Sequence, residues 1–193
     1  AEYVGGDLDG HEEFTVATTA LGETDAPVWR SGAEPGDALC VTGTLGRSAA
    51  ALELFQAGGT ERANDLFRFT PRVADGVALA PHATAMMDSS DGLARSLHQL
   101  AEASGCGFDV DGSALPVDPS VLEVTDDENE ARTLATTFGE DFELVCTLPE
   151  SRLAAVREAC PTALVRVGTA TDDGVLIDGE PLADEGWTHG RTG

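Results

Sequence analysis

Short apolar runs that alternate with amphipathic stretches constrain this 193-residue chain more than any other feature. Because strand and helix patterns alternate throughout, the sequence predicts an α+β fold, an α/β-type sandwich with a mixed sheet flanked by helices. Strands are expected at residues 14–21, 38–42, 84–87, 108–110, 142–148, 163–170 and 175–178. Helices are expected at residues 47–57, 61–69, 73–80, 91–104, 117–137 (in two pieces) and 150–159.

The clearest helical pattern covers residues 91–104. Leu93, Leu97 and Leu100 recur at helical spacing and form one apolar stripe, and Gly105 ends the pattern as a C-terminal cap. Such a stripe packs against the core, so we expect these leucines on one buried face. The other residues of the predicted core are Val110, Leu144, Cys146, Leu153, Val156, Val165 and Val167.

The charge balance excludes some classes of partner. The chain has 35 acidic residues and 11 basic ones, a formal net charge of −24, and all of the basic residues are Arg. A surface this acidic repels nucleic acid and anionic membranes, so we expect neither as a partner. Acid excess without Lys also indicates a salt-loving source, because concentrated salt screens the repulsion among the acids.

The cysteines and the apolar runs bear on location. Four cysteines are scattered without a Cys-x-x-Cys pair, which disfavours a zinc cluster and favours core cysteines in a reducing cytosol. No apolar run approaches the roughly 20 residues of a membrane span, and no signal-peptide pattern is visible. We therefore expect a cytoplasmic protein. Its first residues read like the inside of a domain, which suggests a fragment.

The most informative local motif is the segment 86–93, MMDSSDGL, where a predicted strand meets a predicted helix. Asp88 and Asp91 place two carboxylates in this connection, and Ser90 adds a hydroxyl group. Two interpretations are open. Either the acids cap the helix through its unpaired N–H groups, or they hold a hard cation such as Mg²⁺, which is commonly shared between carboxylates and phosphates. In the second case Ser90 would donate to a phosphate.

Two further segments combine glycine with a charged residue. Asp7 directly follows Gly5 and Gly6, and this group forms either a plain turn or a place where backbone approaches a ligand closely. Arg30 begins the turn-rich segment 30–37, RSGAEPGD. It is either a surface side chain or a planar fork for a phosphate.

The segment 138–144, FGEDFEL, brings three acids to the start of a predicted strand. Glu140 and Asp141 lie in a glycine-preceded loop, where a polar ligand could bind. Glu143 is expected to be solvated at the entry to the strand.

In order and spacing, these segments resemble the thiamine-monophosphate kinases, members of the superfamily that includes aminoimidazole-ribonucleotide synthetase and selenophosphate synthetase. That family shows Gly-Gly-Asp, Arg-Ser-Gly-Ala-x-Pro-Gly-Asp, Val-Thr-Gly-Thr-x-Gly-x-Ser-Ala-Ala, Asp-x-Ser-Asp-Gly-Leu, Gly-Glu-Asp-[Phe/Tyr]-Glu-Leu and a final Gly-[Trp/Tyr]-Asp-His. The matching segments here are residues 5–7, 30–37, 41–50, 88–93, 139–144 and 186–189. The resemblance thus covers nearly the whole chain, although Phe138 replaces a usual Gly and Thr188 replaces the Asp of the final motif.

The resemblance implies a function and a set of site residues. The function is ATP-dependent phosphorylation of thiamine monophosphate to thiamine diphosphate, with Mg²⁺ as the metal and no separate catalytic side chain. The implied ATP contacts are Gly6, Asp7, Arg30 and Ser90. The implied Mg²⁺ ligands are Asp7, Asp88 and Asp91, and the implied contacts to thiamine phosphate are Glu140 and Trp187.

The resemblance also implies a domain organisation. Residues 1–26 would be a remnant of an N-terminal ATP- and Mg²⁺-binding domain, residues 27–193 would form the C-terminal α/β domain, and the full-length protein would be a homodimer. Two alternatives stay open: a non-catalytic fragment that binds nucleotide or dimerises, and another ATP-dependent activity of the same superfamily (hydrogenase maturation, or the synthesis of selenophosphate or aminoimidazole ribonucleotide).

Overall fold

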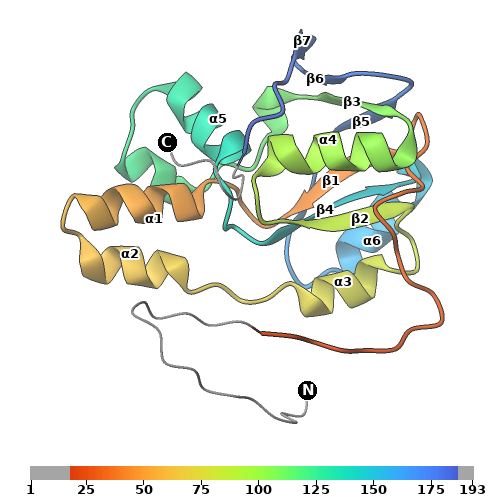
Figure 1. Ribbon diagram of the computed structural model, residues 1–193, viewed down its shortest axis with the longest axis horizontal. Coiled ribbons are helices and arrows are strands. Elements are labelled where there is room, and N and C mark those ends of the chain that lie inside the picture. Colours follow the sequence, from red (N-terminus) through yellow and green to blue (C-terminus); the bar gives the residue numbers. More distant parts are fainter. Residues whose placement is uncertain (1–17, 187–193) are drawn as a thin grey trace.

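The computed structural model describes residues 18–186 of the chain. Within this range seven strands form one mixed sheet with the order β2-β4-β1-β5-β3-β6-β7 (Figure 1). Neighbouring strands are antiparallel except β3 and β6, which are parallel. The strands are β1 (Ala38–Thr42), β2 (Ala85–Ser89), β3 (Gly107–Val110), β4 (Glu143–Leu148), β5 (Leu164–Thr171), β6 (Val175–Ile177) and β7 (Glu180–Pro181). The α-helices are α1 (Arg47–Gln56), α2 (Thr60–Phe67), α3 (Val73–Leu79), α4 (Leu93–Ser104), α5 (Glu128–Thr137) and α6 (Leu153–Ala159).

Alternation along the strands gives the sheet two buried faces. In β1, Leu39 and Val41 belong to one apolar cluster, and Ala38 and Cys40 belong to another. Successive side chains of a strand point to opposite faces, so these two clusters lie on opposite sides of the sheet. Helix α4 covers the first cluster and crosses the sheet in Figure 1, whereas α3 and α6 cover the second.

Helices α1, α2 and α5 lie beside the sheet (Figure 1), and α1 and α5 contribute to a third, smaller core. Ala50 of α1 packs with Ala131 of α5 and with Val121, which belongs to the 3-10 helix Pro119–Glu123. Gly46, which precedes α1, lies against the backbone of Ala135, so the start of α1 is close to the end of α5. The loop from α5 into β4 therefore has to pass the first turn of α1, and that loop carries much of the candidate site.

The expected fold class is confirmed by the mixed sheet and the helices on its two faces. Leu93, Leu97 and Leu100 are all buried on the single inner face of α4, as predicted. The remaining predicted core residues are also buried except Leu144 and Val165, which are half-buried and pack against the edges of the two clusters. Residues 117–137 form two helical pieces, as expected, the first of them the 3-10 helix Pro119–Glu123.

The strand expected at residues 14–21 is not borne out where it can be seen. Residues 18–21 have no regular secondary structure, and Leu21 is 96% exposed. A strand needs a neighbouring strand to satisfy its N–H and C=O groups, and residues 18–21 pair with no strand of the sheet. Residues 14–17 lie outside the described range. Among residues 18–186, no helix is long and apolar enough to cross a membrane.

We expect the stability of this fold to rise with salt. Acidic side chains are exposed on α1, α2, α4, α5 and α6, including Glu53, Glu61, Asp65, Glu102, Glu128 and Glu158. Their mutual repulsion falls as the Debye length shrinks from about 10 Å at 0.1 M salt to about 3 Å at 1 M. Thermal unfolding followed by circular dichroism in increasing KCl should therefore show a rising midpoint. A midpoint that stays flat between about 0.1 and 2 M would contradict this screening argument.

Candidate active site

The connection from β2 to α4 is the first part of the site. The first residue of α4 is Leu93, two residues later than the sequence predicted, because Gly92 precedes it with a φ of 104° that no helix adopts. No side chain among residues 18–186 donates or accepts a capping hydrogen bond at this helix end. Asp88 is exposed within β2, and Asp91 is half-buried. Neither acid therefore acts as a helix cap here, which removes the simpler of the two interpretations of this motif.

The loop before β4 is the second part of the site, and it lies directly against the first. The backbone N–H of Glu140 donates to the carbonyl oxygen of Ser90 at 2.8 Å. Further along, Ser89 and Glu143 are partners in the antiparallel pairing of β2 with β4. Two motifs about 50 residues apart in sequence thus meet at one end of the sheet.

Glu140 has an unusual backbone and a free side chain. Its φ is 67°, a left-handed conformation that is uncommon for residues other than glycine. Its side chain is exposed and lines a cavity of about 400 Å³. The other residues that line this cavity are Leu52, Thr137, Phe138, Gly139 and Gly186. Trp187, predicted to contact the same ligand as Glu140, follows Gly186 in sequence but lies outside the described residues.

Asp141, the neighbour of Glu140, points the other way and is buried. Its carboxylate accepts hydrogen bonds from the backbone N–H groups of Gly46, at 2.6 Å, and Ser48, at 2.9 Å. Burial raises the pKa of Asp141, although these N–H groups act in the opposite direction. The carboxyl group of Asp141 therefore binds a proton more tightly in the native protein than in the unfolded chain. The free energy of unfolding that this protonation contributes is lost as pH rises through the raised pKa.

Glu143 corrects one expectation from the sequence. It is not solvated at the strand entry but almost fully buried, and both of its carboxylate oxygens accept hydrogen bonds from Arg72 at 2.7 Å. Thr42 donates a third hydrogen bond to it, also at 2.7 Å. Arg72 and Glu143 are 71 residues apart, so only the tertiary structure brings them together. No signal in the sequence singled out Arg72.

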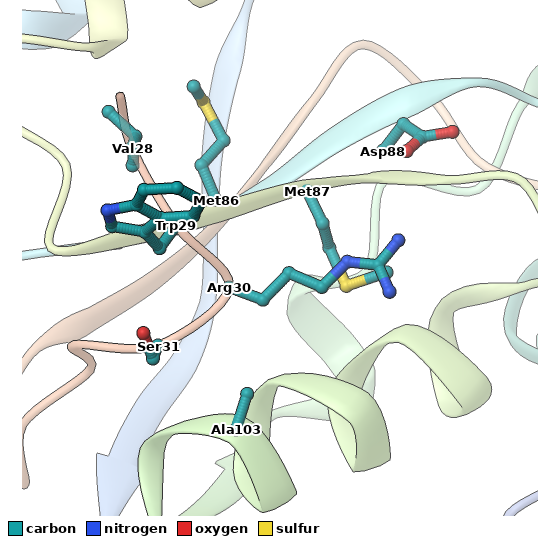
Figure 2. Close-up of a pocket in the computed structure, with 8 residues that line it drawn as sticks. All are labelled: Val28, Trp29, Arg30, Ser31, Met86, Met87, Asp88 and Ala103. Atoms are coloured by element: carbon teal, nitrogen blue, oxygen red, sulfur yellow. The ribbon is translucent and has the colours of Figure 1, made fainter. Parts of the chain in front are cut away.

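Arg30 and Asp88 line a second pocket, of about 500 Å³, beside the edge strand β2. Figure 2 shows that Met86 and Asp88 extend from one side of β2, while Met87 and the Arg30 side chain lie on the other. Arg30 donates to the amide oxygen of Gln99 at 3.3 Å. Arg30, the predicted phosphate contact, and Asp88, a predicted Mg²⁺ ligand, thus line the same pocket from opposite sides of β2.

The structure describes only part of the predicted metal site. Gly6 and Asp7 lie outside the described residues, so the expected set of three metal ligands is represented by Asp88 and Asp91 alone. No group of three or more His, Cys, Asp or Glu side chains that could hold a metal ion occurs within residues 18–186. Carboxylate oxygens are nevertheless the ligands that Mg²⁺ prefers, so these two acids suit it chemically.

Comparison with known proteins gives a consistent assignment. Residues 34–178 match the C-terminal domain of AIR synthase related proteins. The chain is 63% identical over 191 residues to the thiamine-monophosphate kinase of Halobacterium salinarum, covering 98% of this chain and 65% of that protein.

Two solved structures share the fold. The thiamine-monophosphate kinase of Stenotrophomonas maltophilia has a TM-score of 0.74 and 33% identity, over 82% of this chain and 55% of that one. AaThiL complexed with AMPPCP and TMP has a TM-score of 0.70 and 28% identity, over 84% of this chain and 54% of that one. The chain thus spans between about half and two thirds of the proteins it matches. From the family match over 145 of its residues, and from the fold, the chain belongs to the AIR synthase related proteins, through their C-terminal domain.

Proposed function

We propose that this chain is the C-terminal part of a kinase that transfers the γ-phosphoryl group of ATP to thiamine monophosphate. The observation that carries the proposal is the direct contact between the two motifs, where the N–H of Glu140 meets the carbonyl oxygen of Ser90. The start of α4, which no side chain of residues 18–186 caps, suits a phosphate, and the exposed carboxylate of Glu140 suits the cationic thiazolium ring of thiamine. Thiamine-monophosphate kinases among the relatives and the AaThiL structure with AMPPCP and TMP support the same assignment.

The chemistry fits a site with few catalytic groups. The bond between the γ-phosphorus and its bridging oxygen breaks, a phosphate oxygen of thiamine monophosphate bonds to that phosphorus, and ADP leaves. The acceptor oxygen is already ionised at neutral pH, so no strong general base is needed. Positioning and neutralisation of charge then supply most of the rate.

Individual residues have separate parts in this proposal. Ser90 and the first N–H groups of α4 would hold a phosphate of ATP, and Arg30 would contact another from the pocket beside β2. Asp88 and Asp91 would ligate Mg²⁺ together with Asp7, and a bound Mg²⁺ would offset the negative charge of the phosphates. Gly6 would lie next to the nucleotide, and Trp187 and Glu140 would both contact thiamine phosphate, the former through an aromatic face that suits the cationic thiazolium ring.

The setting of the enzyme belongs to the same proposal. We place residues 1–26 in a preceding ATP- and Mg²⁺-binding domain and residues 27–193 in the C-terminal domain, with a homodimer as the full-length assembly. The family match at residues 34–178 supports that boundary. The free cysteines of the described residues suit a reducing cytoplasm, and the net charge of −24, with a relative in Halobacterium, suits a high-salt habitat.

The substitution Asp88→Asn tests this proposal in the full-length protein. Asn keeps the shape of the side chain but removes the charge that holds a cation, so the rate of thiamine diphosphate formation should fall by about 10- to 100-fold. Excess Mg²⁺ should restore part of the rate. The measurement is turnover of ATP and thiamine monophosphate at several Mg²⁺ concentrations, with the thermal midpoint recorded alongside.

Asp109→Asn is the matched control, because Asp109 is also an exposed aspartate within a strand, β3, remote from the motifs of the site. It should leave the rate and its Mg²⁺ dependence unchanged. An unimpaired Asp88→Asn enzyme would remove Asp88 from the site. A full-length wild-type protein without turnover would favour the non-catalytic alternative.

A further inference from the structure

The loop at residues 139–142 is held in an unfavourable backbone conformation. Glu140 and Phe142 both have positive φ angles, of 67° and 52°, although neither is glycine. Each such residue costs about 1 kcal/mol or more, and such strain persists only when the surrounding structure enforces it. The contacts around residues 139–142 must therefore supply the restraint that keeps this backbone conformation.

The start of α1 restrains the loop through hydrogen bonds. Asp141 accepts the backbone N–H groups of Gly46 and Ser48, which would otherwise be unpaired at the start of a helix. The hydroxyl of Ser48 donates to the carbonyl oxygen of Glu140 at 2.8 Å. Helix α1 is thus capped by a residue about 95 positions away in the sequence, and the cap fixes the backbone of Glu140 at the same time.

Aromatic packing and Arg47 provide the second set of contacts to the loop. The Phe142 ring stacks on Phe69 with centroids 5.2 Å apart, and the Arg47 guanidinium lies 5.4 Å from the centre of the Phe69 ring. Arg47 also donates to the backbone carbonyl of Asp141 at 3.3 Å. The backbone on both sides of Glu140 is therefore restrained, while the Glu140 side chain itself is exposed to the cavity.

We propose that Asp141 is a positioning residue, which uses its hydrogen bonds to the start of α1 to aim the Glu140 carboxylate at the thiazolium end of the substrate. This inference rests on the proposed function and adds a residue to it. A carboxylate placed only to cap α1 would not need its neighbours in strained conformations. A restraint on Glu140 explains why burial of an acid and two positive φ angles occur side by side.

The test compares Asp141→Asn, Glu140→Gln and the double variant in the full-length protein. Asn keeps the size of Asp141 but turns one acceptor oxygen into an N–H donor, so one of the two hydrogen bonds is lost. We expect KM for thiamine monophosphate to rise by about tenfold, because a displacement of about 1 Å can cost up to 10²-fold. KM for ATP should change by less than about twofold. The double variant should bind thiamine monophosphate no more weakly than Glu140→Gln alone, because both changes remove the same contact.

Asp127→Asn is the matched control, since Asp127 also accepts two backbone N–H groups at a helix start, that of α5, but is exposed and lies at the end of α5 opposite to the cavity. It should alter the thermal midpoint at most and leave both KM values unchanged. If Asp141→Asn behaves like this control, or if its effect multiplies that of Glu140→Gln, Asp141 is a structural cap and the inference is wrong.

A second variant serves if Asp141→Asn does not fold. Ser48→Ala removes only the hydroxyl bond to the Glu140 carbonyl and leaves the Ser48 N–H for Asp141. It should raise KM for thiamine monophosphate in the same direction and by a smaller factor, and an unchanged KM would overturn the inference. Wild-type protein that does not turn over thiamine monophosphate would instead overturn the proposed function, and this inference with it.

Discussion

Substitution of Glu143 by Ala should lower the free energy of unfolding by about 3–5 kcal/mol. The side chain of Glu143 is 2% exposed and that of Arg72 is 16% exposed, and two parallel hydrogen bonds join them. The hydrogen bonds to Glu143 raise the pKa of Arg72 above its ordinary value. The guanidinium also stays charged when Glu143 is removed, because the ordinary pKa of an arginine already lies far above neutral pH. The variant would leave a largely buried cation without its carboxylate, and Thr42 would lose its acceptor. Urea unfolding at constant KCl measures the effect.

A second ion pair of this chain provides the control. Arg62 and Glu123 also form two hydrogen bonds, at 2.5 and 3.2 Å, but their side chains are 48% and 42% exposed. Removal of the Glu123 carboxylate should cost far less than removal of the Glu143 carboxylate, because water replaces the partner. A loss of similar size in Glu143→Ala would show that burial does not govern the cost. The double change of Arg72 and Glu143 to Met should recover much of the loss, since no unpaired charge remains.

Substitution of Gly139 by Ala should damage both stability and activity. A Cβ atom at this position would overlap the carbonyl oxygen of Ser90 and lie 2.9 Å from its carbonyl carbon and 3.0 Å from the Cα of Asp91. These are backbone atoms that cannot rotate away, so the two motifs would have to separate. Forced overpacking of this kind costs about 1–3 kcal/mol. The hydrogen bond between Glu140 and Ser90 would lengthen, and turnover should fall more than stability alone explains.

Gly76→Ala distinguishes this overlap from a general effect of losing a glycine. Within residues 18–186, a Cβ at Gly76, inside α3, would meet only a methyl group of Leu144 at the ordinary distance of 3.6 Å. This substitution should stabilise the protein by up to about 1 kcal/mol, since Ala favours helix over Gly. Thermal midpoints and turnover of the two variants, measured together, test the argument. A Gly139→Ala protein with wild-type turnover would show that the contact of the two motifs is not needed.

Local patterns determined the elements of the fold and which face of each is buried. The spacing of Leu93, Leu97 and Leu100 was sufficient to orient α4, and the short apolar run at residues 38–42 was sufficient to predict the buried strand β1. Helical and strand periods are properties of a few neighbouring residues, so they can be read without knowing the rest of the structure. The same holds for the polar motifs, whose presence and order were evident in the sequence.

Only the tertiary structure decided what the acids of those motifs do. Three acids lie within four positions of the chain, yet each has a different role. Glu140 lines a cavity, Asp141 caps a distant helix, and Glu143 is paired with Arg72. A carboxylate looks the same in sequence whether water or a buried donor surrounds it. Its role depends on which segments the β2–β4 pairing and the packing of α1 bring to it, and these are long-range contacts that no local pattern contains.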